Sequence, residues 1–189
     1  ASEDDAQASP RDLKTRGFLK DDVLVGVAAS GQTPYTIGAM TYARSLGAFT
    51  VAVTCAPDSS ITRVAEVSIV PVVGPEVVTG STRLKAGTAQ KMVLNMLSTA
   101  TLVKLGYVSG NRMSNLQVRN SQLRARAVRI LMAETDLDEN AAAAALDAGK
   151  GDIRTALVMT RTGSNVEAAK KALAESEGVV PQAINELSK

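Results

Sequence analysis

The sequence predicts an α/β fold built on a parallel sheet, followed by a small helical bundle. Over the first 80 residues, three short valine-rich runs alternate with helix-like segments, which is the order found in parallel sheets with right-handed crossovers. Each run is apolar throughout, as is typical of strands buried on both faces. Beyond residue 80 only helical patterns follow. These observations favour a sheet flanked by helices over an all-helical or all-β fold.

Proline and glycine residues mark where the predicted helices of the first part begin and end. Pro10 and Pro34 each suit the first position of a helix, and Gly47 ends the second of these helices. The predicted elements are a helix from Ser9 to about Gly17, strands at 22–28, 49–55 and 67–73, a helix from 34 to 46, and a helical turn at 61–65. Three strands are few, since open sheets usually carry about four to six. We therefore expect that further structure precedes this chain.

The second part of the chain is predicted to be helical. A long helix at 83–105 carries an apolar stripe and ends at Gly106. Four further helices are predicted at 116–133, 138–148, 152–161 and 165–176, the last beginning with a capping box of Ser164 and Glu167. We expect two domains, residues 1–135 with the sheet and residues 136–189 as a compact helical appendage.

Composition excludes several classes of function. The chain has 189 residues, a formal net charge of +2 and 3% aromatic residues, so neither a basic footprint nor a base-stacking platform for nucleic acid is present. It has no histidine, which excludes a histidine general base and histidine metal ligands. No apolar run reaches the roughly 18 residues of a membrane span. We expect no nucleic-acid or membrane partner and no metal site.

The number of cysteines excludes further kinds of site and indicates the compartment. Cys55 is the single cysteine, so an internal disulfide and a thiolate zinc site are both excluded. This usage is consistent with a reducing cytoplasm, where we place the protein. Without a histidine to activate it, Cys55 is better explained as a core residue than as a nucleophile.

The first candidate binding site is the loop Ser30-Gly31-Gln32-Thr33, between the end of a predicted strand and a helix start. In open α/β sheets ligands bind at this position, and the free N–H groups of a helix start attract anions. Gly31 would allow close approach of the backbone, while Ser30 and Thr33 would add hydroxyl donors. The alternative is an ordinary β–α turn with Thr33 as a helix cap.

The second candidate site is the segment from Gly74 to Lys85, which also joins a strand to a helix. Hydroxyl and cationic side chains here could close over the same anion. The candidate residues are Glu76, Ser81, Thr82, Arg83 and Lys85. A polar surface loop with a capped helix is the alternative. Two such loops in one α/β unit make a phosphorylated ligand more plausible than either loop does alone.

Carboxylates are the leading candidates for a general base, because histidine is absent. Glu3 lies in an acidic N-terminal stretch and Glu76 in the second candidate loop. The alternative for Glu3 is a solvated tail, and Glu76 could instead pair with an arginine. A basic helix face is better explained as solvated than as an RNA site; it comprises Arg119, Arg124, Arg126 and Arg129.

Two longer strings resemble a known family. They are GVAASGQTPYTIGAMTYARSLGAFTVAVTC and PVVGPEVVTGSTRLKAGTAQKMVLNMLSTATLVKLG, and they resemble the N-acetylmuramic acid 6-phosphate etherases. These are sugar isomerase (SIS) domain proteins related to the glucokinase regulatory protein. The resemblance implies a SIS-type, flavodoxin-like parallel sheet, here its C-terminal part, and a ubiquitin-associated-like helical bundle at the end. The second string is the more specific, since the SGxT loop is shared across SIS domains.

The resemblance also implies an activity in amino-sugar and peptidoglycan recycling. The family cleaves the D-lactyl ether of its substrate without a cofactor, by elimination and hydration, and yields N-acetylglucosamine 6-phosphate and D-lactate. Ser30, Gly31 and Thr33 match the family's phosphate loop, and Ser81 and Thr82 match its second sugar-phosphate loop. Ser2-Glu3-Asp4-Asp5 looks like an acidic stretch in which a glutamate assists catalysis, and that glutamate would be Glu3. The resemblance further implies a homodimer, with helix 83–105 contributing to the interface.

The sequence departs from the family pattern in ways that bear on activity. Nothing in it matches the family's Gly-rich GxGTSGR loop or the ECPPT segment with its main acid/base glutamate, and Gln32 stands where arginine is usual. We therefore expect a C-terminal part of an etherase, with little or no activity by itself. A regulatory phosphosugar-binding module and a sugar-phosphate isomerase remain as alternatives.

Overall fold

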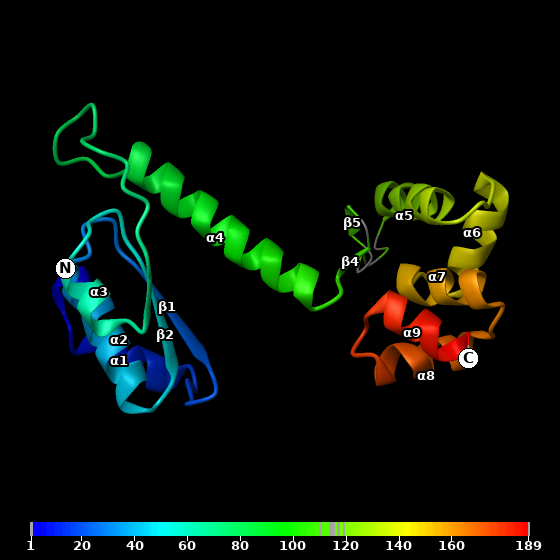
Figure 1. Ribbon diagram of the computed structural model, residues 1–189, viewed down its shortest axis with the longest axis horizontal. Coiled ribbons are helices and arrows are strands. Elements are labelled where there is room, and N and C mark those ends of the chain that lie inside the picture. The colour runs from blue at the N-terminus through cyan, green and yellow to red at the C-terminus, as the bar shows by residue number, and fades with distance from the viewer. Residues whose placement is uncertain (1, 110, 114–115, 117, 119, 189) are drawn as a thin grey trace. The chain divides into compact units, whose positions relative to one another are not determined.

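A computed structural model describes residues 2–109, 111–113, 116, 118 and 120–188 of the chain. The chain divides into two compact units, Ala1–Leu97 and Ser98–Lys189, and each unit has its own cluster of buried apolar side chains. The first unit contains a parallel sheet with helices, so the predicted α/β class is confirmed (Figure 1).

The sheet of the first unit has the strand order β1-β2-β3 and is parallel throughout. Its strands are β1 (Val23–Val27), β2 (Phe49–Val53) and β3 (Val67–Ile69). The third strand is shorter than the predicted run, which extended to residue 73. Pro71 explains the difference, because a proline has no N–H to donate to a neighbouring strand.

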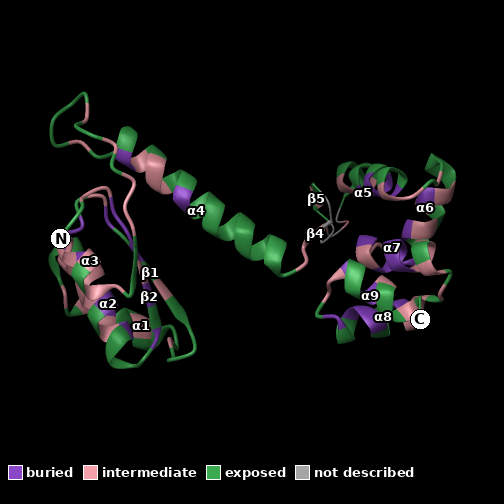
Figure 2. Ribbon diagram, in the orientation of Figure 1, coloured by how far each residue is buried: buried purple, intermediate pink, exposed green. Residues whose placement is uncertain are grey.

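Helix α2 (Pro34–Ser45) and helix α3 (Ser60–Val64) cover one face of this sheet. Met40 of α2 is fully buried and packs with Ala52 and Ile61. The opposite face carries exposed apolar side chains, including Val23 at 58% and Phe49 at 45% exposure (Figure 2), and these two residues are paired across β1 and β2. The predicted strands are therefore buried on one face only.

The N-terminal segment packs against α2. It consists of the short 3₁₀ helix η1 (Ser2–Asp4) and helix α1 (Ala8–Thr15), both of which contact α2. The close approach depends on Gly38 of α2, because a Cβ at this position would overlap the carbonyl oxygen of Ala6. Helix α1 begins at Ala8 rather than at the predicted Ser9, because Asp5 Oδ1 accepts hydrogen bonds from the N–H groups of Gln7 and Ala8.

Helix α4 (Lys85–Lys104) begins against the carboxyl end of β2. Ala86 is buried, and the Gln90 side-chain amide donates to the Val53 carbonyl oxygen at 3.2 Å. Farther along α4, large apolar side chains are exposed, among them Met92, Leu94 and Met96. The predicted stripe of this helix is thus only partly buried.

The second unit is a helical bundle preceded by a short hairpin. The hairpin pairs β4 (Val108–Ser109) with β5 (Arg112–Met113) in antiparallel orientation. The helices are α5 (Ser121–Glu134), α6 (Glu139–Ala148), α7 (Ile153–Thr162), α8 (Val166–Glu175) and α9 (Val180–Leu187). Neither the hairpin nor α9 was predicted from the sequence.

Several helix boundaries in this unit differ from the sequence prediction, and two of the differences involve an asparagine cap. Helix α5 begins at Ser121, not at 116, because the Asn120 side chain accepts a hydrogen bond from Leu123 N–H at 2.8 Å. Helix α8 is capped by Asn165, which accepts from Ala168 N–H, and not by the predicted Ser164. In both helices the cap is an asparagine, which the sequence analysis did not identify.

Helix α5 also bears on the predicted domain boundary at 135/136. Its residues Ala127, Ile130 and Leu131 are buried in the same core as Leu146 of α6 and Leu157 of α7. The structure therefore places α5 with the small helices, whereas the sequence analysis placed it with the sheet. That the bundle is a ubiquitin-associated-like domain, and that the chain divides into domains at 135/136, stay predictions. Among the described residues, no helix is both long and apolar enough to span a membrane.

Candidate functional site

The first predicted loop is fixed to the loop that follows β2. The Ala29 carbonyl oxygen accepts hydrogen bonds from Cys55 N–H at 3.0 Å and from Thr54 Oγ1 at 3.1 Å. Two residues farther along the loop, the Gly31 carbonyl oxygen accepts a hydrogen bond from Ile61 N–H at 3.1 Å. The carboxyl ends of β1 and β2 are thereby joined, which is where open α/β sheets place their ligands.

Gly31 adopts a backbone conformation that favours glycine, with φ of +65°. A Cβ here would overlap the Ser59 side chain and would lie 2.9 Å from Thr54 Oγ1. Ser59 is 3% exposed, and its Oγ has no hydrogen-bond partner among the described residues. Gly31 thus allows the loop to lie directly against two buried hydroxyl-bearing side chains.

The hydroxyl groups predicted to bind an anion flank Gly31. Ser30 is exposed, and its Oγ accepts a hydrogen bond from Gln32 N–H at 3.3 Å, which leaves the Ser30 hydroxyl proton available to a ligand. Thr33 is the residue before α2, and its side chain makes no cap hydrogen bond. Thr33 therefore does not act as the side-chain cap that the alternative explanation of this loop required.

In the second predicted loop, Glu76 caps the start of α4. Its Oε2 accepts from Lys85 N–H at 3.0 Å, and its Oε1 accepts from Ala86 N–H at 3.0 Å. These backbone hydrogen bonds, from Ala86 first and then Lys85, hold the pKa of Glu76 below its ordinary value. The carboxylate therefore occupies the helix start where the sequence analysis expected an anionic ligand.

The other predicted residues of the second loop have local roles. The Lys85 ammonium donates to the Pro75 carbonyl oxygen at 2.9 Å. Ser81 N–H donates to Val78 O, and Thr82 O accepts from Gly87 N–H. Arg83 is exposed. Within the described part of the chain, no hydrogen bond joins these four residues to the loop at Ser30–Thr33.

Cys55 connects the two candidate loops. Its N–H donates a hydrogen bond to the Ala29 carbonyl oxygen, and its thiol donates to the Ala86 carbonyl oxygen at 3.9 Å. Burial and the nearby charge of Glu76 raise the pKa of Cys55. The start of α4 therefore lies close to the end of β2, so that both candidate loops reach the same edge of the sheet.

Glu3 lies in η1, which contacts α2. The side chain is exposed, and the chain three residues later lies against Gly38, near the start of α2. The segment is thus attached to the helix that follows the Ser30–Thr33 loop. This position favours neither a free tail nor a formed catalytic contact.

Replacing Glu76 by glutamine is expected to lower the thermal stability of the first unit at pH 7, because the amide provides a single uncharged acceptor oxygen for two backbone donors. The pKa of Glu76 is lower in the folded state, so its stabilisation is present above the ordinary value of 4.5 and is lost as pH falls through the folded-state pKa. The Tm difference between the wild-type and Glu76→Gln proteins should therefore shrink from pH 7 to pH 3.

Glu66→Gln is the control for this experiment, since Glu66 is exposed and its side chain makes no hydrogen bond or ion pair among the described residues. Circular dichroism melting curves of the three proteins at both pH values make the comparison. Equal Tm changes for the two variants at pH 7 would contradict the capping role of Glu76.

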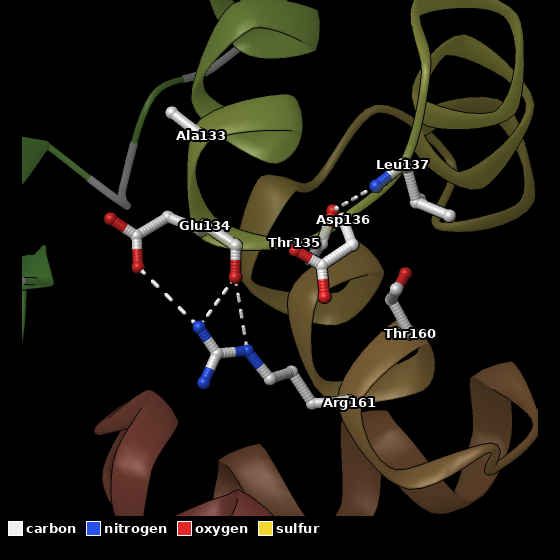
Figure 3. A pocket seen from close by; sticks show the side chains of 7 residues that line it. All are labelled: Ala133, Glu134, Thr135, Asp136, Leu137, Thr160 and Arg161. Carbon is white, nitrogen blue, oxygen red and sulfur yellow. Dashed lines mark hydrogen bonds and ion pairs between the residues drawn. The ribbon is translucent and has the colours of Figure 1, made fainter.

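The second unit contains a cavity of about 590 Å³ beside the end of α5 (Figure 3). Arg161 of α7 donates to the Glu134 carbonyl oxygen through Nε at 3.1 Å and through a terminal nitrogen. A cation here stabilises the carboxyl end of a helix. None of the predicted site residues lines this cavity, and the contacts of Arg161 are explained by its structural role.

One arginine of the basic face predicted on helix 116–133 has a structural role. Arg124 forms a two-pronged ion pair with Asp147 of α6, at 2.6 and 2.8 Å, which raises the pKa of Arg124 and lowers that of Asp147. Arg126 and Arg129 are exposed, and Arg119 lies outside the described residues. Among the described residues, no group of three potential metal ligands is gathered.

Two polar residues beside the first loop were missed by the sequence analysis. Ser60 Oγ donates to Gln32 Oε1 at 2.5 Å, and Arg63 donates to Ser60 Oγ at 3.4 Å. The sequence analysis places Arg63 in a helical turn at 61–65 and assigns no role to Ser60. The serine pair at 59–60 was visible in the sequence, but its proximity to Gln32 depends on the tertiary fold.

Comparison with known proteins confirms the resemblance seen in the sequence. Residues 18–100 match the SIS domain. The chain is 49% identical to N-acetylmuramic acid 6-phosphate etherase 2 of Vibrio cholerae over 98% of its own length and 60% of the relative. It is 46% identical to the N-acetylmuramic acid 6-phosphate etherase of Clostridium botulinum, over 99% of this chain and 62% of the relative. The chain thus spans about 60% of the length of these curated relatives.

Proposed function

We propose that this chain forms the phosphosugar-binding part of an N-acetylmuramic acid 6-phosphate etherase. The observation that carries the proposal is the loop Ser30–Thr33, which Gly31 and Ile61 hold at the carboxyl edge of a parallel sheet. Identity of 46–49% to proteins of that name along nearly the whole chain supports the same substrate class. The ligand would be a phosphorylated amino sugar, bound without a cofactor.

Phosphate binding would use the groups that the structure leaves available at the first loop. The Ser30 hydroxyl can donate outward, and Thr33 adds a second hydroxyl beside the start of α2. In the first turn of α2, Pro34 has no N–H and the Ile37 N–H donates to the Thr33 carbonyl oxygen. The N–H groups of Tyr35 and Thr36 therefore have no partner within the helix, and the helix dipole favours an anion there. Ser81, Thr82, Arg83 and Lys85 are the residues that we propose for the sugar side of the same site.

Ether cleavage by elimination needs a base for the C2 proton and an acid for the departing lactate oxygen. Of the two predicted carboxylates, Glu76 is held by two backbone donors and has a lowered pKa, which makes it a weak base. Glu3 is therefore the carboxylate that we propose to assist catalysis, while Glu76 positions α4.

One observation favours a second candidate, a phosphosugar-binding module of regulatory type. The reaction calls for two proton-transferring groups, and the use of Glu76 as a helix cap leaves Glu3 alone among the predicted carboxylates. A chain with only one of these groups would bind the sugar phosphate without cleaving it. The two candidates therefore differ in turnover and not in binding.

The test measures D-lactate release and binding with the same protein. The chain is incubated with N-acetylmuramic acid 6-phosphate, and D-lactate is followed with a coupled dehydrogenase, while calorimetry measures binding of N-acetylglucosamine 6-phosphate. Lactate release that falls in a Glu3→Gln variant supports the etherase. Binding without release is the result expected of a chain that holds one of the two proton-transferring groups, and turnover by a protein of the relatives' full length then separates the two candidates. The absence of both binding and release contradicts a phosphosugar function.

We further propose a cytoplasmic homodimer. The exposed Met92 and Met96 of α4, which lie one turn apart on the same face of the helix, support this assembly, because clustered apolar side chains on a protein surface are typical of interfaces. The lone thiol of Cys55 is compatible with a reducing compartment. Light scattering is expected to give about twice the 19.7 kDa chain mass, and Met92→Lys should lower that mass. A uniform monomer at micromolar concentration would contradict the dimer.

A further inference from the structure

The phosphate loop Ser30–Thr33 carries hydroxyl and amide groups but no cationic side chain. Sites that bind phosphate in water commonly add an arginine or lysine, because charge-assisted hydrogen bonds are stronger than neutral ones. A cation for this loop would have to come from another part of the chain. Helix α3 is a direct source, since its Ile61 N–H donates to the Gly31 carbonyl oxygen of this loop.

Arg63 of α3 is linked to the phosphate loop through one intervening side chain. One guanidinium nitrogen donates to Ser60 Oγ at 3.4 Å, and Ser60 Oγ donates in turn to Gln32 Oε1 at 2.5 Å. A single hydroxyl therefore separates the guanidinium from Gln32, the central polar residue of the loop.

The guanidinium is also held from its other side. Its second terminal nitrogen donates to the Asp58 carbonyl oxygen at 2.6 Å. Asp58 itself has a positive φ of 55°, a conformation that aspartate tolerates better than most residues. The turn formed there fixes the carbonyl group that orients Arg63.

The charge of Arg63 is not compensated within the described part of the chain. The residue is exposed, and its two recorded acceptors, a hydroxyl and a backbone carbonyl, are neutral. No carboxylate of a described residue forms an ion pair with it. A guanidinium has five N–H donors, so several remain for an anion after these two contacts.

We propose that Arg63, oriented by Ser60 and Asp58, binds the phosphate group of a sugar phosphate held at the Ser30–Thr33 loop. This inference rests on the proposed function and adds a cationic residue on the phosphate side of that site. The planar guanidinium would contact phosphate oxygens with two parallel donors, a geometry that a lysine cannot reproduce. Gln32 would serve as the positioning residue between the two loops.

Arg44 offers a matched control on the same pair of helices. It lies in the last turn of α2 and donates to the Val64 carbonyl oxygen at 2.8 Å. It is likewise exposed and has a neutral backbone acceptor. Helix α2 has 12 residues, which at 1.5 Å per residue puts Arg44 roughly 15 Å from the phosphate loop.

The experiment compares the wild-type chain with Arg63→Gln, Arg63→Lys and Arg44→Gln, after circular dichroism has confirmed that each is folded. Calorimetry measures the Kd for N-acetylglucosamine 6-phosphate, for inorganic phosphate and for unphosphorylated N-acetylglucosamine. Loss of one charge-assisted contact is expected to weaken sugar phosphate binding about 10- to 100-fold in Arg63→Gln. Arg63→Lys should recover part of this loss, and Arg44→Gln should bind as the wild type does.

The outcomes separate this inference from the proposed function. Equal Kd values for Arg63→Gln and Arg44→Gln, with tight binding to the wild type, would overturn the role of Arg63 and leave the phosphosugar site standing. A wild-type chain that binds neither phosphate nor the sugar phosphate would overturn both. Binding of phosphate alone, weakened in Arg63→Gln, would support the role of Arg63 and contradict the sugar specificity.

Discussion

Substitution of Gly31 by alanine is expected to lower the free energy of unfolding of the first unit by about 2–5 kcal/mol. Two costs combine. A left-handed backbone disfavours a residue with a Cβ by roughly 1–2 kcal/mol, and the φ of Gly31 is +65°. The new methyl group would also overlap the buried Ser59 side chain, and overpacking typically costs about 1–3 kcal/mol.

Gly47→Ala is the control that separates these two costs. Gly47 has a φ of +80°, and nothing lies within 4 Å of a Cβ built there, so only the backbone cost applies. Urea unfolding followed by circular dichroism provides both values. Because the loop would be displaced as well, Gly31→Ala should abolish binding of N-acetylglucosamine 6-phosphate, whereas Gly47→Ala should retain it. Equal destabilisation by the two substitutions would contradict the close packing of Gly31 on Ser59.

Substitution of Leu157 by alanine is expected to destabilise the second unit by about 2–5 kcal/mol, the usual range for a buried leucine. Leu157 of α7 is 2% exposed and lies in the core shared by α5 through α9. Met132 of α5, which is 38% exposed, provides the control, and Met132→Ala should have a much smaller effect.

Hydrogen exchange read by mass spectrometry locates the loss. Amides of α5 to α9 should exchange faster in Leu157→Ala, while those of β1 and β2 keep their protection, because the sheet belongs to a separate unit with its own core. Equal loss of protection in both units would show that they unfold together. The result therefore also tests whether the sheet can be studied without the bundle.

The sheet and its first loop were predictable because their signals are local. The valine-rich runs at 23–27 and 49–53 and the turn at Gly31 are each contained within a few residues of sequence. Strand order then follows from the short crossover helices between parallel strands. The loop Ser30–Thr33 was placed correctly between a strand and a helix for the same reason, since a strand end followed by Thr33-Pro34 defines it.

The parts that escaped prediction depend on tertiary contacts. The sequence placed Glu76 in the correct loop, but its role as a helix cap requires the chain to turn back over nine residues to Lys85 N–H. The roles proposed for Ser60 and Arg63 depend on their proximity to Gln32. Gln32 is 28 residues from Ser60 in sequence, so this proximity is set by the tertiary fold. The start of α5 was set too early because the apolar pattern begins before the cap at Asn120.

The rate at which the Cys55 thiol is alkylated reports whether the two candidate loops stay joined. Cys55 Sγ bonds the Ala86 carbonyl oxygen in the first turn of α4, and burial together with Glu76 raises the pKa of the thiol. Alkylation requires the thiolate, so a docked α4 slows labelling. Release of that turn would expose the sulfur and speed the reaction. A timed iodoacetamide experiment on the unmodified protein thus follows, without any engineered probe, whether a ligand tightens or loosens this edge of the sheet.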